Sequence, residues 1–239
     1  MAAPGYLQLI GFGEGGWGWQ FLAGTAMTVE ISVCGYAVGI GLGLLGAWAK
    51  LSPARPARWL GDLYTTLVRA VPELLLIILL YYTGTTKLRE LLVALGASPD
   101  IQVNAFAAAV ATLGFVQGAY MTEIFRGAIL AVPRGVMEAG RALALKPAHR
   151  FRLILFPLMM RYALPGMSNQ WLAILKDSSL ISVVGFSELL FTGKTAAGST
   201  KEYFFFYLYT AILFLALTLV SNAGIGQIKR RVNRGYVRT

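Results

Sequence analysis

The sequence predicts an all-α protein that crosses a membrane five times, and three observations lead to this prediction. The composition is 56% hydrophobic and 13% charged, with a mean hydropathy of +0.62, which is far more apolar than an ordinary soluble domain. Apolar runs recur along the 239 residues, and each is long enough for the roughly 20 residues that a membrane-spanning helix needs. Most basic residues lie in short segments between these runs, where orientation signals belong.

The apolar runs divide the chain into three parts. Residues 1–20 lack the basic start of a secretion signal, and their Trp residues suit a membrane interface. Residues 229–239 form a basic tail. Between these ends, residues 21–228 predict one membrane domain, whose five spans are expected at 21–49, 59–82, 104–132, 151–175 and 202–227.

Small residues and prolines give the first two spans local features. Gly35, Gly39 and Gly43 favour close helix–helix approach in the first span. Pro72 lies inside the second span, where its missing backbone donor loosens the helix. A separate short surface helix is then expected at 87–95, ended by glycine.

The stretch before the last span predicts a broken helix and then a loop. Within 176–185, the Asp and Ser side chains indicate that one helix stops and another begins with a new N-cap. The segment that follows, up to Lys201, is rich in Gly, Ser and Thr and is expected to be a loop.

Two glycine motifs that suggest nucleotide binding are discounted. The G-x-G-x-x-G string within 39–46 lacks the strand and the soluble βαβ unit that a dinucleotide loop needs. The G-K-T at 193–195 lacks the first glycine of a phosphate loop, since Glu188 stands at that position. No His/Cys/Asp/Glu cluster has metal spacing. The chain is therefore expected to be neither an enzyme nor a metalloprotein.

The distribution of Lys and Arg predicts the orientation in the membrane. With five spans, the loops 50–58 and 133–157 and the tail share one side. That side, with the adjoining residues, holds 15 Lys/Arg against five on the other side. Because basic residues in short loops favour the cytoplasm, the C-terminus is expected to be cytoplasmic and segment 1–20 periplasmic.

The longest basic interruption, 133–157, contains five basic residues and one acid, Glu138. Apolar side chains between them predict an amphipathic helix of roughly 12 residues. Lys146 should end it, because the residue before a proline is pushed out of the α region. Such a helix is suited to press against a soluble partner, or alternatively to lie on the lipid surface.

The spacing within this segment resembles the EAA loop of ABC importer permeases, E-A-A-x-x-x-G, nine residues, I-x-L-P. Here Glu138, Ala139, Ile154 and Pro157 match, while Gly140, Ala144 and Phe156 replace the second Ala, the Gly and the Leu. The Ala at 144 is expected to be harmless because it is small and favours helix more than Gly. Segments 112–128, 160–169 and 174–185 also resemble the polar amino-acid branch, nearest the histidine, lysine/arginine/ornithine and opine permeases, and the resemblance covers about residues 20–235.

This resemblance implies the type I ABC importer permease (MetI-like) fold in a bacterial inner membrane. It implies a second homologous permease, an ATPase pair that binds ATP and Mg, and a periplasmic substrate-binding protein, with no cofactor in this chain. It also implies that the 133–157 helix couples to the ATPase, through Met137, Glu138, Ala139, Gly140, Ala142, Leu143 and Ala144. The alternatives are an ATP-independent secondary transporter or channel, for which longer chains with internal repeats are usual, or a membrane scaffold.

Four residues are candidates for the substrate pathway. Charges inside spans usually face the bundle interior or a water-filled path, so Glu30 and Glu73 could attract a cationic amino acid. Alternatively, Glu73 pairs with Arg69 four residues before it, and Glu30 makes an interhelical hydrogen bond. Ser178 and Ser179 line a gate or meet the substrate carboxylate if the helix is broken there; otherwise they lie in an outer loop.

Overall fold

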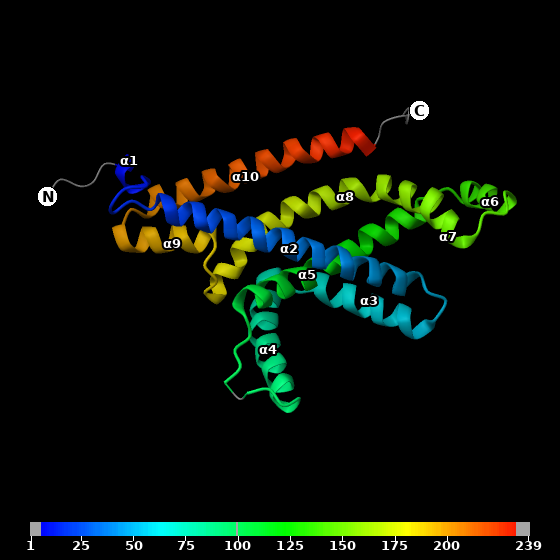
Figure 1. Cartoon of the computed structure of the whole chain (residues 1–239), viewed down its shortest axis with the longest axis horizontal. Helices are drawn as coiled ribbons and strands as arrows, with labels where there is room; N and C mark the ends of the chain where they lie inside the picture. The colour runs from blue at the N-terminus through cyan, green and yellow to red at the C-terminus, as the bar shows by residue number, and fades with distance from the viewer. Residues whose placement is uncertain (1–5, 99, 233–239) are drawn as a thin grey trace.

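The computed structural model describes residues 6–98 and 100–232, and every regular element within those residues is helical (Figure 1), which confirms the all-α prediction. Helix α6 and the short α7 project from one end of the bundle, and α4 leaves its side. The elements in chain order are α1 (Tyr6–Leu9), α2 (Gly18–Leu51), α3 (Arg55–Ala70), α4 (Glu73–Ala94), α5 (Ala105–Leu130), α6 (Arg134–Ala142), α7 (Pro147–Arg150), the π-helical turn η1 (Phe151–Leu155), α8 (Phe156–Asp177), the 3-10 segment η2 (Ser178–Val184), α9 (Leu189–Thr200) and α10 (Tyr203–Val232).

Three of the helices in residues 6–98 and 100–232 are long and apolar enough to cross a membrane, namely α2, α5 and α10. They correspond to the spans expected at 21–49, 104–132 and 202–227. The pair α3 and α4 counts as a fourth if it is taken as one broken span. The span expected at 151–175 is helical over η1 and α8, but α8 is not counted among the helices that are both long and apolar enough to cross a membrane. Five spans therefore stay a prediction.

The helix of the second span expected at 59–82 is broken at Pro72, where α3 and α4 are bent by 114° relative to one another. Val71 precedes a proline and takes an extended backbone (φ −96°, ψ 141°), and Pro72 follows at φ −54° and ψ 132°. Two successive non-helical residues redirect the chain. Helix α4 then runs unbroken to Ala94, so the expected surface helix at 87–95 is its last part, and Gly96 follows its end with φ +97°.

The expected new helix start after Lys176 and the expected loop up to Lys201 are also wrong. Asp177 keeps a helical backbone and caps nothing, so η2 continues α8 until Gly185 at φ +86°. Helix α9 occupies the Gly/Ser/Thr-rich segment, and the buried Glu188 carboxylate starts it by accepting hydrogen bonds from the backbone N–H of Leu190 (2.9 Å) and Phe191 (2.8 Å). Burial raises the pKa of the Glu188 carboxyl, although these donors oppose the shift.

Helices α2 and α5 form the central pair of the bundle, and the small residues expected to allow close approach lie between them. A methyl group added at Gly39 would lie 3.0 Å from Cβ of Gln117, and one added at Gly43 would lie 2.3 Å from Cβ of Met121. Asn104 begins α5 as a side-chain cap, accepting from the N–H of Ala107 at 3.1 Å. Close backbone contact along this pair fixes the position of α5.

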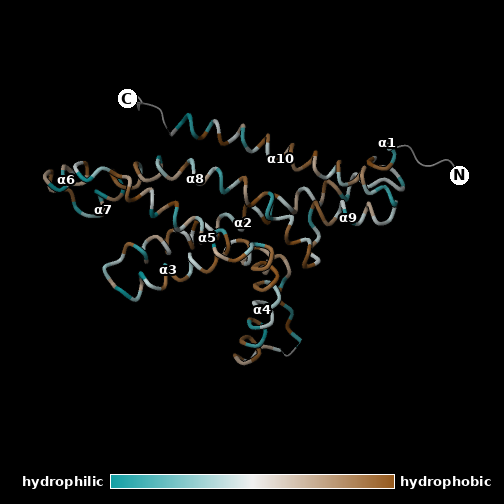
Figure 2. Tube along the Cα trace, turned by 180° about the vertical axis from the view of Figure 1, so that it is seen from behind, coloured by the Kyte–Doolittle hydropathy of each residue, from teal (hydrophilic) through white to brown (hydrophobic). Residues whose placement is uncertain are grey.

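Hydrophilic residues gather at one end of the molecule, where Figure 2 shows them at α6 and α7, at the turn between α2 and α3, and at the end of α10. These are the segments whose basic residues were assigned to one side of the membrane. The described part of the basic tail, 229–232, continues α10 as helix, and the remainder, 233–239, lies outside the described residues, as do residues 1–5.

The glycine contact between α2 and α5 predicts the effect of one added methyl group. Gly43→Ala should destabilise the protein by about 1–3 kcal/mol, because the methyl group meets both Cβ and the backbone of Met121. Gly41→Ala on the same helix is the matched control, since its methyl group meets nothing within 4 Å. Thermal unfolding of the purified protein in detergent would measure both, and equal shifts would contradict the close contact.

Candidate functional site

The segment expected to couple to an ATPase forms a shorter helix than predicted. Helix α6 has nine residues rather than roughly 12, and it ends before Lys146. The N–H of Ala144 donates to the carbonyl of Arg141 (2.9 Å) and the N–H of Leu145 to that of Gly140 (3.2 Å). This pair of hydrogen bonds is a Schellman ending, which closes the helix and turns the chain towards α7.

Ala144 has a left-handed backbone with φ +52°, so the expectation that Ala suits this position as a good helix former is wrong. The residue lies just beyond the helix, where the Schellman ending requires the left-handed conformation. In a non-glycine residue this conformation costs roughly 1–2 kcal/mol. The left-handed backbone at this position therefore explains the glycine of the EAA pattern, and Ala144 adopts the same backbone only with strain.

Most of the predicted coupling residues lie on an outward surface. Glu138, Ala139, Ala142 and Leu143 are exposed, and Leu143 shows 74% of its surface. Gly140 lies on the opposite face, where an added methyl group would meet Cδ1 of Ile154 in η1 at 2.6 Å. The half-buried Met137 borders a pocket of about 360 Å³, lined by Ile129, Val132, Arg134, Met137, Glu138, Arg141 and Leu155.

This outward surface is chemically suited to a protein partner. It combines exposed apolar side chains, Leu143 and Val136, with one carboxylate, Glu138, and neighbouring guanidinium groups. A projecting amphipathic helix of this kind fits a groove on a partner, with apolar contact for affinity and charge for orientation.

Four charged residues form an ion-pair network where α2, α3 and α5 meet. The ammonium group of Lys50 lies 2.9 Å from Asp62 and 2.5 Å from Glu123, and it donates to Thr65 at 2.8 Å. Glu123 also pairs with Arg126, at 2.9 Å. The network fastens three helices together at the hydrophilic end of the molecule.

A second polar cluster lies inside the bundle and was not found by sequence reasoning. Gln117, fully buried on α5, donates to Asp177 (3.0 Å) and accepts a hydrogen bond from Gln170 of α8. Glu73, at the start of α4, interacts electrostatically with Asp177 and lies beside Tyr120. The polar residues stand singly in apolar runs, which is the signal that could have indicated them.

The predicted substrate residues fall in different places. Glu73 belongs to the interior cluster, whereas Glu30 is exposed on α2 and is not among the charges acting on Asp177. Ser178 is buried and donates to the carbonyl of Leu175 (2.8 Å), and Ser179 donates to that of Lys176 (2.6 Å). Neither hydroxyl caps a helix start.

The alternative pairing of Glu73 with Arg69 required one continuous helix, which the 114° bend removes. The guanidinium group of Arg69 instead lies 5.7 Å above the ring of Tyr120. The carboxylate of Glu73 lies beside Tyr120 of α5 and interacts electrostatically with Asp177.

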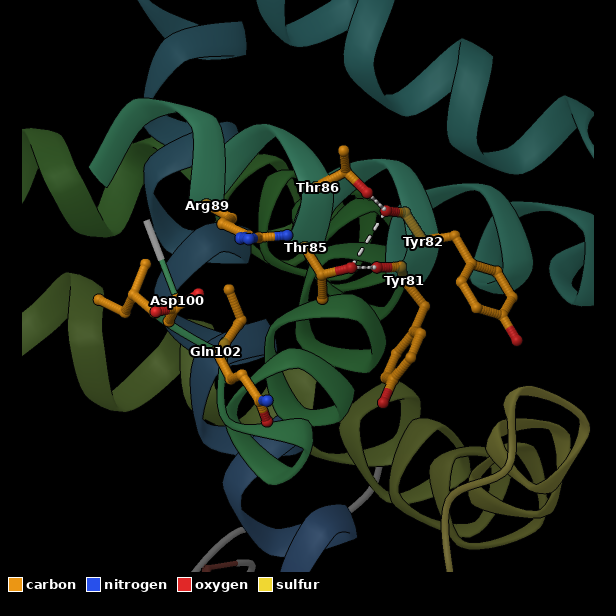
Figure 3. A pocket seen from close by; sticks show the side chains of 9 residues that line it. Tyr81, Tyr82, Thr85, Thr86, Arg89, Asp100 and Gln102 are labelled. Atoms are coloured by element: carbon orange, nitrogen blue, oxygen red, sulfur yellow. Dashed lines mark hydrogen bonds between the residues drawn. The ribbon is translucent and has the colours of Figure 1, made fainter. Parts of the chain in front are cut away.

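A pocket of about 430 Å³ lies between the end of α4 and the segment that follows it (Figure 3). Arg89 from α4 and Asp100 and Gln102 from that segment surround it, with Tyr81 and Tyr82 at its other side. Both signs of charge border the cavity, so it can receive a polar or zwitterionic group. Sequence reasoning did not single out these residues. Among residues 6–98 and 100–232, no group of three His, Cys, Asp or Glu could hold a metal ion.

Lowering the strain at Ala144 should stabilise the protein. Ala144→Gly should raise the unfolding free energy by about 1 kcal/mol, because glycine adopts φ +52° without the steric cost. Ala142→Gly, the same change two residues earlier and inside α6, should lower it by up to about 1 kcal/mol. Thermal unfolding distinguishes the two signs, and destabilisation by both would exclude a strained residue 144.

Comparison with known proteins places this geometry among transport proteins. Residues 39–234 match the family described as binding-protein-dependent transport system inner membrane component. The chain is 44% identical to the nopaline transport system permease protein NocQ of Agrobacterium fabrum over 230 residues, covering 96% of this chain and 98% of NocQ. It is 39% identical to the histidine/lysine/arginine/ornithine transport system permease protein HisQ of Escherichia coli, covering 91% and 95% of the two chains.

Solved structures agree with these sequence matches. The crystal structure of an amino acid ABC transporter with histidines superposes with a TM-score of 0.76 at 27% identity, covering 90% of this chain and 95% of that one. An inward-facing structure of the MetNI methionine ABC transporter superposes with a TM-score of 0.67 at 19% identity, covering 90% and 94%, and supports the fold alone.

Proposed function

This chain belongs to the family of binding-protein-dependent transport system inner membrane components and is a permease subunit of an ABC importer for polar amino acids or opines; we propose that its substrate is cationic. The observation that carries the function is the likeness over nearly the whole length of NocQ and HisQ, which are permeases for nopaline and for histidine, lysine, arginine and ornithine. An ATP-independent transporter is not favoured by these relatives.

We propose that α6 couples this subunit to a separate ATPase, which binds ATP and Mg and performs the hydrolysis. The exposed apolar residues and Glu138 would enter a groove on that ATPase. A second permease, homologous to this chain, would complete the membrane unit, and a binding protein would deliver the substrate. The projection of α6 beyond the bundle supports this arrangement (Figure 1).

The proposed orientation places α6 and the end of α10 in the cytoplasm and α1 at the periplasmic side. The gathering of basic segments at one end of the molecule supports it, since basic residues favour the cytoplasmic side.

Motion would pass from the ATPase to the interior through packed helices. Gly140 of α6 lies against Ile154 of η1, and η1 continues directly into α8. Helix α8 ends at Asp177, which is bonded to Gln117. A displacement of α6 therefore acts on the helix that holds two residues of the interior cluster, and ATP binding would alternate the access of that cluster to the two sides.

The substrate path proposed here includes Glu73 and Asp177, while Ser178, Ser179 and the exposed Glu30 remain further candidates. Two half-buried carboxylates near one another would attract a cationic side chain. The amides of Gln117 and Gln170 supply both donors and acceptors for the neutral part of the ligand.

Reversing the charge of Glu138 tests the coupling role. Glu138→Lys should leave the chain inserted in the membrane but reduce ATP-dependent uptake by about 30-fold or more, the equivalent of about 2 kcal/mol for an interfacial charge that loses its partner. Uptake would be measured in proteoliposomes that contain the whole importer, with arginine as substrate. Glu14→Lys makes the same charge change at an exposed site in the loop before α2 and should transport normally. Wild-type uptake by Glu138→Lys would remove this residue from the coupling mechanism.

Neutralising Glu73 tests the charge argument for the substrate. Glu73→Gln should raise the apparent KM for arginine by about 10-fold but change the KM for glutamine little, because one interaction with the cationic side chain is lost. Glu30→Gln would be measured beside it, with Glu90→Gln, an exposed carboxylate on α4, as the control. Equal effects of Glu73→Gln on both substrates would contradict a charge-selective role, and an effect confined to Glu30→Gln would move the path to α2.

A further inference from the structure

A groove between α8 and α10 is almost entirely apolar and leads to a basic cluster at the end of α10. Its volume is about 530 Å³, within the range of about 300–1,000 Å³ typical of ligand pockets. We propose that this groove holds one acyl chain of an anionic phospholipid, whose phosphate binds the basic cluster. The residues that form the walls include Tyr36, Leu164, Trp171, Gly224, Ile225 and Ile228.

Two of the hydroxyl groups that line the groove are satisfied within the protein, and most of the other lining side chains are apolar. The hydroxyl of Tyr36 donates to the carbonyl of Met167 (2.8 Å), and that of Ser168 donates to the carbonyl of Leu164 (2.6 Å). The rings of Tyr36 and Trp171 meet edge to face with centroids 5.3 Å apart. Such walls offer mainly apolar contact, which suits a hydrocarbon chain better than a polar ligand.

Glycine keeps the groove open on the side of α10. A methyl group added at Gly224 would meet nothing within 4 Å, so the space beside this residue is unfilled. Helix α10 is long enough to span a membrane, yet only 11% of its most apolar stretch is buried in the protein. Its remaining surface must therefore be covered from outside, by lipid or by another helix.

The position of the charges favours a lipid. Lys229, Arg230 and Arg231 follow directly after Ile228, and the last two are exposed. From Ser221 to Lys229 the helix rises by about 12 Å, close to the roughly 15 Å depth of one leaflet's hydrocarbon. An acyl chain in the groove thus places its phosphate at the height of the basic cluster, where anionic headgroups are attracted.

The groove suits a single hydrocarbon chain as its occupant. Its apolar walls run from Trp171 on α8 to Ile228 on α10. Because the basic cluster follows directly after Ile228, a chain seated in the groove is continuous with a headgroup at that cluster. A helix of the second permease is the competing occupant, which a cross-link from Gly224→Cys would reveal.

Lipid retention by the purified importer tests the proposal. The complete complex would be equilibrated in phosphatidylcholine vesicles containing a minor fraction of phosphatidylglycerol and then extracted into mild detergent, and the lipid retained per permease would be measured by mass spectrometry. The wild type should retain phosphatidylglycerol beyond its bulk fraction. Gly224→Leu, which fills the groove, should abolish this excess, and Gly226→Leu, whose position is also open but does not line the groove, should keep it.

Removing the basic charges tests the contribution of the lipid headgroup separately from that of the acyl chain. With Lys229, Arg230 and Arg231 all changed to Gln, the preference for phosphatidylglycerol should fall by about five-fold per charge, while some lipid is still retained. If Gly224→Leu does not assemble with its ATPase, Ile225→Trp fills the same groove and replaces it. Equal retention by wild type and groove-filled variants, or a wild-type lipid ratio equal to the bulk, would overturn the proposal. Cross-linking of Gly224→Cys to a helix of the second permease would do the same, and none of these outcomes affects the assignment as a permease.

Discussion

The close approach of α2 to α5 is the constraint on which the interior of this permease depends. Gly39 and Gly43 let the two backbones come so near that Gln117 and Met121 pack directly against α2. Because α5 is thereby fixed in the centre of the bundle, Gln117 is fully buried and reaches Asp177 on α8. A buried amide must find partners, so the glycine contact also determines which polar groups meet inside the protein.

The exposed end and the buried centre are joined by helices without a flexible link. Helix α6 rests on η1 at Gly140, and η1 runs into α8 without a break in the backbone. The ion-pair network around Lys50 holds α2, α3 and α5 together at the same end. In the proposed coupling, a displacement of α6 would therefore act on α8 through η1, while the ion-pair network holds α2, α3 and α5 together.

Sequence patterns predicted structural features that depend on neighbouring residues. They missed features that depend on residues far apart in the chain. The glycine contact of α2 was predicted from residue types, and the break at Pro72 was indicated but interpreted as a loosened helix instead of a bend. Composition favoured a loop for the segment of α9, yet the buried carboxylate of Glu188 starts a helix there, held by Thr28 of α2. The hydrogen bond between Gln117 and Asp177 joins residues 60 positions apart, so no local sequence pattern indicates it.

Two small residues of the proposed coupling segment replace those of the EAA pattern. The pattern has Ala and then Gly, whereas this chain has Gly140 and Ala144. Gly140 lets Ile154 approach within 2.6 Å of where a methyl group would stand, so α6 lies closer to η1 than an alanine would allow without movement of that side chain. Ala144 carries the left-handed strain that glycine would avoid. The tighter contact on one side of α6 and the strained turn on the other act on the same nine-residue helix, and packing against η1 is what holds the strained turn in place.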